Sequence, residues 1–314
     1  MDRRAFLSLS LFAPFALKSG LVCYGAEYSP VTNVIEASFS KSPSSPKGTL
    51  WQIPRQQPAQ MMGYVYRADN GQTVVFDGGW DKEAPYLIDL IKRECGGKVD
   101  AWFLTHAHYD HCGAVGEIIV RKPDEIKIDK LYYNFPDLDW ILEHEKSTYA
   151  ARIFDELKHF QGNARAPEVN ETFQFGSTVI KCLNDYDLSL TMNAINNSSI
   201  TFRLDVDEKS ILILGDLGKE AGDRLAALQS KETLDCDFVQ MAHHGQQGVR
   251  REFYDIVDPS VCLWPTPDWL WENNQGGKGP NTGPWKTLET RAWVKEMGIE
   301  KNFVSKDGLV KLTF

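Results

Sequence analysis

Three histidines and one aspartate are concentrated in Thr105-His106-Ala107-His108-Tyr109-Asp110-His111, directly after the short apolar run of residues 99–104. Such a run is typical of a buried strand. In a loop at a strand end, residues spaced at i, i+2, i+4 and i+5 can turn their side chains toward one point. Imidazole and carboxylate are the ligands that borderline divalent metals prefer. The segment therefore predicts a metal site, the alternative being turn caps and solvated loop residues.

Further metal-type residues follow two other apolar runs. Asp216 comes after residues 210–214, and the adjacent pair His243 and His244 comes after residues 237–241. The two histidine clusters together hold five of the seven histidines of the chain. Asp216 can supply a carboxylate that bridges two ions, and His243 a terminal imidazole.

The remaining pattern predicts two β-rich halves with helices outside them. This arrangement favours an α/β (α+β) layered sandwich over a doubly wound sheet. Apolar alternation and β-branched runs predict the strands, which are residues 61–67, 73–76, 99–104, 172–183, 199–206, 210–214, 237–241, 300–304 and 309–314. Apolar residues at helical spacing predict the helices, which are residues 81–95, 137–161, 220–228, 248–256 and 286–297.

Composition limits the classes of function. With 314 residues, 42% of them apolar, the chain can bury a sizeable core as one large domain or two small ones. Its 34 Lys and Arg against 43 Asp and Glu give a net charge of −9, which argues against an extended surface for duplex nucleic acid. Five cysteines follow residue 26, an odd number without framework-like spacing, so at most one or two disulfides are expected.

The N-terminus has the layout of an export signal. Arg3 and Arg4 precede an apolar run at residues 9–17 that is too short to span a bilayer. We therefore expect residues 1–26 to be a signal peptide of twin-arginine type, or an ordinary secretory signal or anchor, and the protein to be periplasmic or extracellular. No transmembrane domain is expected after its removal. Residues 27–47 are rich in Ser and Pro and predict a linker.

The motif His-x-His-x-Asp-His at residues 106–111 resembles the signature of the metallo-β-lactamase superfamily. More narrowly, the segments 196–204, 212–216 and 239–245 resemble the metallo-hydrolase domain of DNA-uptake competence proteins. The resemblance covers about residues 48–314 and implies a single domain with a four-layered αββα sandwich. It also implies an enzyme, a metallo-hydrolase with one or two ions at one edge of the sheets, Zn²⁺ or alternatively Mn²⁺.

Roles follow from the resemblance position by position. It implies a ligand set of His106 and His108 for the first ion, Asp110 and His111 for the second, Asp216 between them, and His243 completing the second site. His244 would contact substrate or exchange roles with His243. Asp77, after an early strand, matches an acidic position that supports the ligands, although a plain turn aspartate before Gly78 and Gly79 explains it equally well.

One departure from the family pattern leaves the first site incomplete. Many members carry a further histidine after a middle strand, yet no histidine lies between His159 and His243. Asp185 could ligate in its place, or it could simply turn the chain. The number and identity of the ions therefore stay open.

The implied chemistry is hydrolysis by a metal-activated water. Asp110 would orient the nucleophile, and His244 or a water would protonate the leaving group. The competence-like motifs favour a small-molecule or short phosphodiester substrate. Two alternatives stay open, an acyl hydrolase acting on a lactone, thioester or β-lactam, and a non-catalytic metal-binding protein. The sequence does not give the oligomeric state.

Two further features bear on the substrate. Arg250 and Arg251 could meet phosphate oxygens, or they could lie on a solvated helix turn. The tryptophan-rich residues 264–271, with the glycine-rich segment 273–283 and Trp285, predict a loop or lid beside the site, where the rings either stack on a ligand or pack the loop onto the domain.

Overall fold

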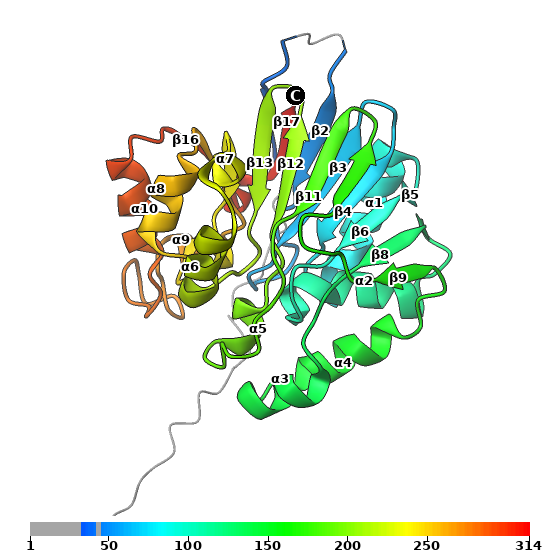
Figure 1. The fold of residues 1–314 in the computed structure, drawn as a ribbon, viewed down its shortest axis with the longest axis horizontal. Coiled ribbons are helices and arrows are strands. Elements are labelled where there is room, and N and C mark those ends of the chain that lie inside the picture. The colour runs from blue at the N-terminus through cyan, green and yellow to red at the C-terminus, as the bar shows by residue number, and fades with distance from the viewer. Residues whose placement is uncertain (1–32, 42–44) are drawn as a thin grey trace, which may run out of the picture.

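Two β-sheets lie face to face at the centre of the computed structural model, which describes residues 33–41 and 45–314 (Figure 1). The first sheet has eight strands in the order β1-β17-β2-β3-β4-β6-β8-β9 and the second has seven in the order β10 to β16. The first contains β1 (Val34–Ser38), β2 (Gly48–Gln52), β3 (Gly63–Ala68), β4 (Thr73–Asp77), β6 (Ala101–Phe103), β8 (Lys130–Tyr132), β9 (Asn163–Arg165) and β17 (Leu309–Thr313). The second contains β10 (Thr172–Phe175), β11 (Thr178–Cys182), β12 (Phe202–Val206), β13 (Lys209–Ile213), β14 (Phe238–Gln240), β15 (Val261–Trp264) and β16 (Lys301–Val304). A small third sheet pairs β5 (Lys98–Val99) with β7 (Lys127–Ile128).

Helices cover the outer face of each sheet. Those packed on the first are η1 (Asp81–Glu83), α1 (Ala84–Cys95), α2 (Tyr109–Arg121), α3 (Leu138–His144) and α4 (Thr148–Leu157). Those on the second are α6 (Lys219–Leu228), α7 (Lys231–Leu234), α8 (Arg251–Val257), α9 (Asp268–Trp271) and α10 (Thr287–Glu296). The short elements α5 (Ala194–Asn197), η2 (His243–Gly245) and η3 (Ser305–Asp307) lie in connections. The four-layered αββα sandwich expected from the sequence is confirmed.

Three apolar layers hold the sandwich together. The middle layer lies between the sheets, where alternate side chains of both inner faces, such as Phe76, Phe103 and Phe202, meet with ring centroids 4.9–5.6 Å apart. The two outer layers pack the opposite sheet faces on the helices. The central strands β4, β6, β14 and β15 are therefore covered on both faces, and this explains why they are largely apolar, whereas strands nearer the sheet edges such as β10 alternate between buried and exposed residues.

The two sheets end at a common edge, where parallel neighbours release their loops. β4 and β6 are parallel neighbours in the first sheet, as are β13 and β14 in the second. Asp77 and the 105–111 segment therefore emerge side by side, and so do Asp216 and the His243–His244 pair. The backbone bond from the N–H of Ile200 to the carbonyl of Thr105, at 2.8 Å, ties the two loop systems together.

Several predictions from the sequence differ from the structure or concern residues that it does not describe. Within the predicted linker, residues 34–38 form the edge strand β1, which pairs parallel to β17. The pattern misses it because none of its five residues is fully buried. The rest of that linker and the predicted signal at residues 1–26 lie largely or wholly outside the described residues. The five cysteines of the described chain are free and buried, without a disulfide among them.

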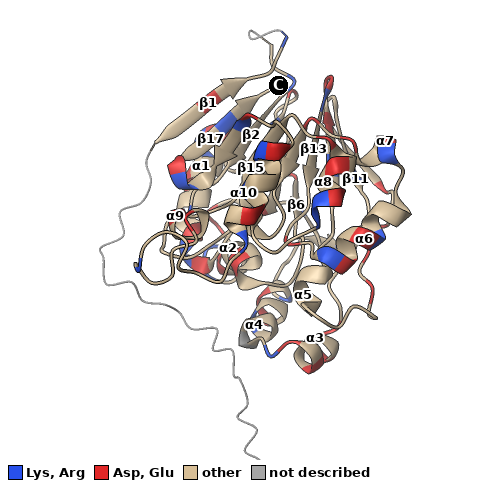
Figure 2. Ribbon diagram, turned by 90° about the vertical axis from the view of Figure 1, so that its left-hand side faces the viewer, with Lys and Arg blue, Asp and Glu red and all other residues tan. Residues whose placement is uncertain are grey.

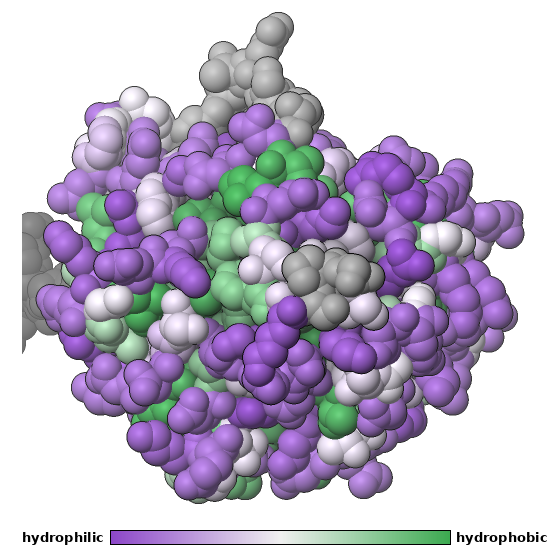
Figure 3. Space-filling model, turned by 90° about the horizontal axis from the view of Figure 1, so that it is seen from above, coloured by the Kyte–Doolittle hydropathy of each residue, from purple (hydrophilic) through white to green (hydrophobic). Residues whose placement is uncertain are grey.

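The surface shows no strong segregation of charge or apolar character in the views drawn. Basic and acidic residues alternate over α6, α8 and α10 (Figure 2). The end of the sandwich seen from above is largely hydrophilic around a narrow apolar strip (Figure 3). Within residues 33–41 and 45–314, helices are too short or too polar for a bilayer span.

Helix α2 lies unusually close to the turn that follows β4. A Cβ added to Gly113 would lie 2.6 Å from the backbone nitrogen of Asp81 and 2.9 Å from the backbone of Trp80. The N–H of Ala114 bonds the carbonyl of Gly79 at 2.8 Å. This close approach places the first turn of α2, with Asp110 and His111, beside Asp77.

We predict that Gly113→Ala destabilises the fold by about 1–3 kcal/mol, because the added methyl meets backbone that cannot move aside. In an ordinary helix the same change stabilises by about 0.5–1 kcal/mol. Urea unfolding measures the difference, with Val120→Ala on the same helix, 37% exposed, as a nearly neutral control. An unchanged or raised midpoint for Gly113→Ala would show that the close approach is not a constraint.

Candidate metal centre

Two groups of ligand-type atoms lie at the common edge of the sheets. One consists of His106, His108 and Asp216, and the other of Asp110, His111 and His244, with the ligand atoms of each group within 4.8 Å of one another. The residues come from four segments, namely the loop after β6, the first turn of α2, the loop after β13 and the turn η2 after β14. The fold thus brings together side chains that are up to 138 positions apart in the sequence. Their positions directly after apolar strands predict this meeting.

Asp216 lies between the two groups and is 1% exposed. Its Oδ2 is 3.8 Å from Nε2 of His106 and 3.3 Å from Nε2 of His244, and its Oδ1 is 3.2 Å from Nε2 of His111. One carboxylate therefore faces imidazoles of both groups. This is the position of a bridging ligand.

Within each group the facing atoms are close. In the first, Nε2 of His106 is 3.1 Å from Nδ1 of His108. In the second, Nε2 of His244 is 3.2 Å from Oδ2 of Asp110. Ligands of one zinc ion lie about 2.0–2.2 Å from it, so separations of about 3–4 Å between ligand atoms suit a shared ion.

The outward nitrogens of the histidines are held by hydrogen bonds. His111 donates from Nδ1 to Oδ2 of Asp77 at 2.7 Å, and His244 donates from Nδ1 to the carbonyl of Pro265 at 3.1 Å. Nδ1 of His106 bonds Oγ1 of Thr105 at 3.0 Å, and that hydroxyl donates to Oδ2 of Asp77 at 2.7 Å. These partners hold Nδ1 of each ring, so that Nε2 faces the centre, as in many metal sites.

Asp77 is fully buried and supports the ligands of both groups, through His111 and, by way of Thr105, through His106. Its Oδ1 also accepts the N–H of Thr105 at 2.8 Å. The sequence left a plain turn aspartate open as an alternative, and these contacts exclude it.

Glu145 plays the corresponding part for His108. Nε2 of His108 donates to Oε1 of Glu145 at 3.0 Å, and Oε2 of Glu145 accepts the N–H of Ile195 at 3.2 Å. The carboxylate thus connects the end of α3 and the start of α5, both in the lower part of Figure 1, with the first ligand group. It turns Nδ1 of His108 toward His106.

Charges in the second group are strongly coupled. Burial alone would lower the pKa of His111, but the carboxylates of Asp216 and Asp77 raise it well above the ordinary value. Burial likewise opposes protonation of His244, yet Asp216 and Asp110 raise its pKa to about 9. The carboxylates around these two imidazoles thus favour positive charge at the second group, and a divalent cation there would compete with protons for the same nitrogens.

The centre has the properties of a cation site. Nε2 of His111, Nε2 of His244 and Oδ1 of Asp216 are buried without a hydrogen-bond partner. Leaving such atoms unpaired in the protein interior costs free energy. Divalent cations would supply the missing partners, and the mixture of imidazole and carboxylate suits Zn²⁺ or Mn²⁺. The residues present therefore fit the metal ions that the sequence motif implies.

Two residues named from the sequence lie elsewhere than expected. Oδ1 of Asp185 pairs with Nη2 of Arg224 at 2.7 Å, and neither group of ligand atoms includes it. Nε2 of His243 lies 3.9 Å from Oδ2 of Asp216 but outside both groups, while His244 occupies the second. Of the two role assignments left open for these histidines, the geometry favours the exchanged one.

The residues named for substrate contact are engaged with the protein itself. Arg250 pairs with Asp223, and Arg251 with Glu296. Trp264 is buried at the end of β15, Trp271 packs edge-on against it at 5.1 Å, and Trp269 contacts Trp285 at 4.8 Å. In this conformation the tryptophans pack the segment onto the domain.

Gln60 and Gln246 complete the surroundings of Asp110. Gln60 donates from Nε2 to Oδ2 of Asp110 at 3.2 Å, and Gln246 donates to Oε1 of Gln60 at 3.3 Å. Sequence reasoning missed both, and also Glu145, because a single Gln or Glu far from the motif carries no local signal.

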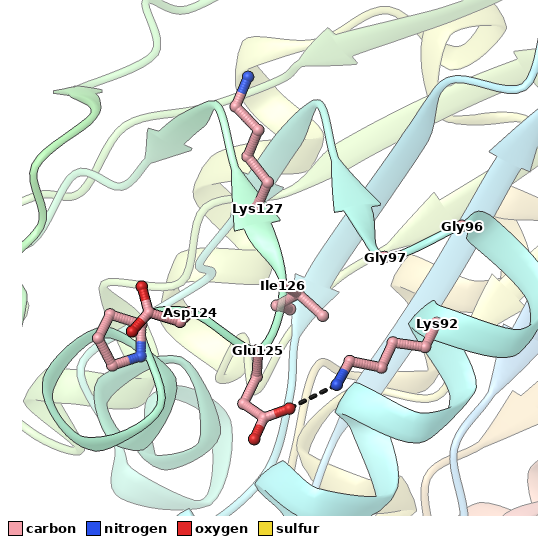
Figure 4. Close-up of a pocket in the computed structure, with 8 residues that line it drawn as sticks. Lys92, Gly96, Gly97, Asp124, Glu125, Ile126 and Lys127 are labelled. Atoms are coloured by element: carbon pink, nitrogen blue, oxygen red, sulfur yellow. Dashed lines mark hydrogen bonds and ion pairs between the residues drawn. The ribbon is translucent and has the colours of Figure 1, made fainter.

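A hollow of about 550 Å³ lies away from the centre, where Lys92 pairs with Glu125 beside Gly96 and Gly97 (Figure 4). Neither group of metal-type side chains found among the described residues borders it.

Comparisons with known proteins bear on the family of residues 61–175 and on the fold. Residues 61–175 match the family model of the Metallo-beta-lactamase superfamily. A comparison with curated protein sequences finds no match. Among solved structures, the chain is similar to the metallo-beta-lactamase fold protein YhfI from Bacillus subtilis, with a TM-score of 0.50 and 12% identity, over 84% of this chain and 99% of that one. This likeness shows a shared fold.

Two further solved structures are similar at lower scores. CmlA, a diiron beta-hydroxylase from Streptomyces venezuelae, has a TM-score of 0.48 and 13% identity, over 87% of this chain and 55% of that one. Zn²⁺-bound PqqB from Methylobacterium extorquens has a TM-score of 0.34 and 12% identity, over 59% of this chain and 57% of that one.

We predict that Glu145→Ala weakens binding of Zn²⁺ to the first ligand group by about 10–100-fold, because His108 loses the partner that orients it. Glu145→Gln keeps an oxygen acceptor and should lose less. Competition with a chromophoric chelator measures the affinity, and Glu143→Ala, an exposed change two residues earlier near the end of α3, is the matched control. Equal affinities for all variants would refute the positioning role.

Proposed function

We propose that the protein is a metal-dependent hydrolase of a small phosphodiester or a short phosphorylated substrate, since residues 61–175 match the family model of the Metallo-beta-lactamase superfamily and the chain shares the fold of a metallo-beta-lactamase fold protein. The observation that carries the proposal is the meeting of two ligand groups at Asp216. A pair of groups that share one carboxylate fits a binuclear centre, an arrangement that recurs in phosphatases and nucleases.

Two divalent ions at this centre would activate a water for attack and neutralise the charge that develops on phosphoryl oxygens. His106, His108 and Asp216 would hold one ion, and Asp110, His111, His244 and Asp216 the other. Zn²⁺ is the ion that this donor set favours, with Mn²⁺ as the alternative.

Asp110 has a second part in the proposal, the orientation of the attacking water. Gln60 holds its Oδ2 at 3.2 Å, and Gln246 in turn holds Gln60, so that the carboxylate is fixed by hydrogen bonds as well as by ligation. His244 lies between two carboxylates, a position that suits a ligand better than a proton donor. The catalytic part expected for His244 is therefore better described as ligation.

The phosphodiester class rests on the competence-like motifs. With Arg250 and Arg251 engaged in ion pairs, the contact with phosphate oxygens would fall to the ions of the centre. A substrate held at that one point is small or short, and an acidic chain has little to hold a long duplex.

We predict that the metal-loaded protein hydrolyses bis-p-nitrophenyl phosphate and that His108→Ala lowers the rate by about 100-fold or more, as expected for loss of a group that supports the transition state. His159→Ala, an exposed histidine away from the centre, should leave the rate unchanged. Nitrocefin, a lactone and a thioester are assayed on the same samples. Turnover of these acyl substrates alone would indicate an acyl hydrolase, and no turnover by protein holding its full metal complement would indicate a binding protein.

We also propose that the protein is exported, on the strength of residues 1–26, which lie outside the described residues. Periplasmic accumulation in a bacterial host should be lost when Arg3 and Arg4 are both replaced by Lys, because twin-arginine recognition reads that pair. Cell fractionation measures it. Export that survives the double change would point to an ordinary secretory route.

A further inference from the structure

The first ligand group has one side chain fewer than the second when the shared Asp216 is counted in both. His106, His108 and Asp216 make three, of which Asp216 is shared with the second group. Asp185, the substitute that the sequence suggested, is paired with Arg224 on the protein surface. Glu145 faces the outward nitrogen of His108. The remaining metal-type side chain beside Asp216 is His243.

The backbone aims His243 at the centre. His243 and His244 have φ angles of 52° and 54°, so two consecutive residues other than glycine lie in the left-handed region. That conformation is costly for side chains with a Cβ and is usually kept where function requires it. The N–H of His243 bonds the carbonyl of Gly215, directly before Asp216, at 3.1 Å. The turn thus directs both rings toward the same carboxylate.

The nitrogens of His243 are arranged like those of His244. Nδ1 donates to a backbone carbonyl, that of Gln247 at 3.3 Å, and Nε2 faces Oδ2 of Asp216 at 3.9 Å. The amide Nδ2 of Asn196 lies 3.3 Å from the same Nε2 and can only donate, so Nε2 carries a lone pair. The separation of 3.9 Å is at the upper limit of the range of about 3–4 Å for two ligands of one zinc ion, and His243 lies outside the 4.8 Å grouping of His106, His108 and Asp216, so its ring must turn toward the ion to bind it.

We propose that His243 is the missing ligand of the first ion, so that His106, His108, Asp216 and His243 hold it together. This inference rests on the proposed binuclear centre. The adjacent histidines then bind different ions, His243 the first and His244 the second. His243 would thus take the place of the histidine that many family members carry after a middle strand, although it comes from a later part of the chain. Asn196 keeps its other partner, Oδ1 of Asn193 at 2.9 Å, when Nε2 turns to the ion.

The test is the metal content of His243→Gly, in which glycine accepts the positive φ without strain and the ring is removed. After dialysis against metal-free buffer, the wild type should retain about two ions per chain and the variant about one. Imidazole added at millimolar concentration should restore the second ion by filling the space of the lost ring. Asp185→Ala and His159→Ala are the controls and should retain the full complement.

Metal content is read independently of turnover. Loss of one ion in His243→Gly with recovery by imidazole supports the inference even if no phosphodiester is hydrolysed. A variant that keeps both ions with unchanged affinity, while its hydrolysis slows, would overturn the inference in favour of a substrate contact. If His243→Gly fails to fold, as judged by circular dichroism, His243→Asn at the same φ replaces it with the same expected loss.

Discussion

The buried carboxylate of Asp216 is the constraint on which this centre depends. The residue is 1% exposed and lies where both sheets end, and four imidazoles each have a nitrogen within 3.9 Å of its carboxylate oxygens. A carboxylate in such a place must be compensated, because the interior does not solvate it. Without metal, the imidazoles of His111 and His244 face the carboxylate, which raises the pKa of both. Cations can take over that part, so the same arrangement is satisfied in two chemically different ways.

The scaffold holds this arrangement at a cost in conformation. Asp77, His243 and His244 all have positive φ, and Gly215 at φ 61° lies so close to Thr105 that a Cβ would meet its side chain at 2.8 Å. Strain of this kind persists where the surrounding packing determines the position of the backbone. Here two sheets with apolar cores on both faces do so, and the loops at their common edge have little freedom to relax.

The sequence predicted the family, the four layers and the central motif, because each rests on a local pattern. His106 to His111 lie within one loop and one helical turn, and the central strands are largely apolar runs. The sequence did not predict the contacts of side chains whose partners lie far along the chain. Glu145 finds His108 across 37 positions, and Asp185 is drawn away by Arg224, 39 positions later. The choice between His243 and His244 depends on two backbone angles that no periodicity encodes.

Two divalent ions would be held by a centre that is itself strongly acidic. Their four positive charges would meet the carboxylates of Asp110 and Asp216 among the ligands and those of Asp77 and Glu145 behind them, so the centre as a whole would be close to neutral. The net charge of −9 of the chain acts over longer distances and is screened over about 8–10 Å at physiological ionic strength. Substrate binding would therefore depend on direct contact of substrate oxygens with the ions, for a phosphodiester as for the oxyanion that develops on an ester or lactone.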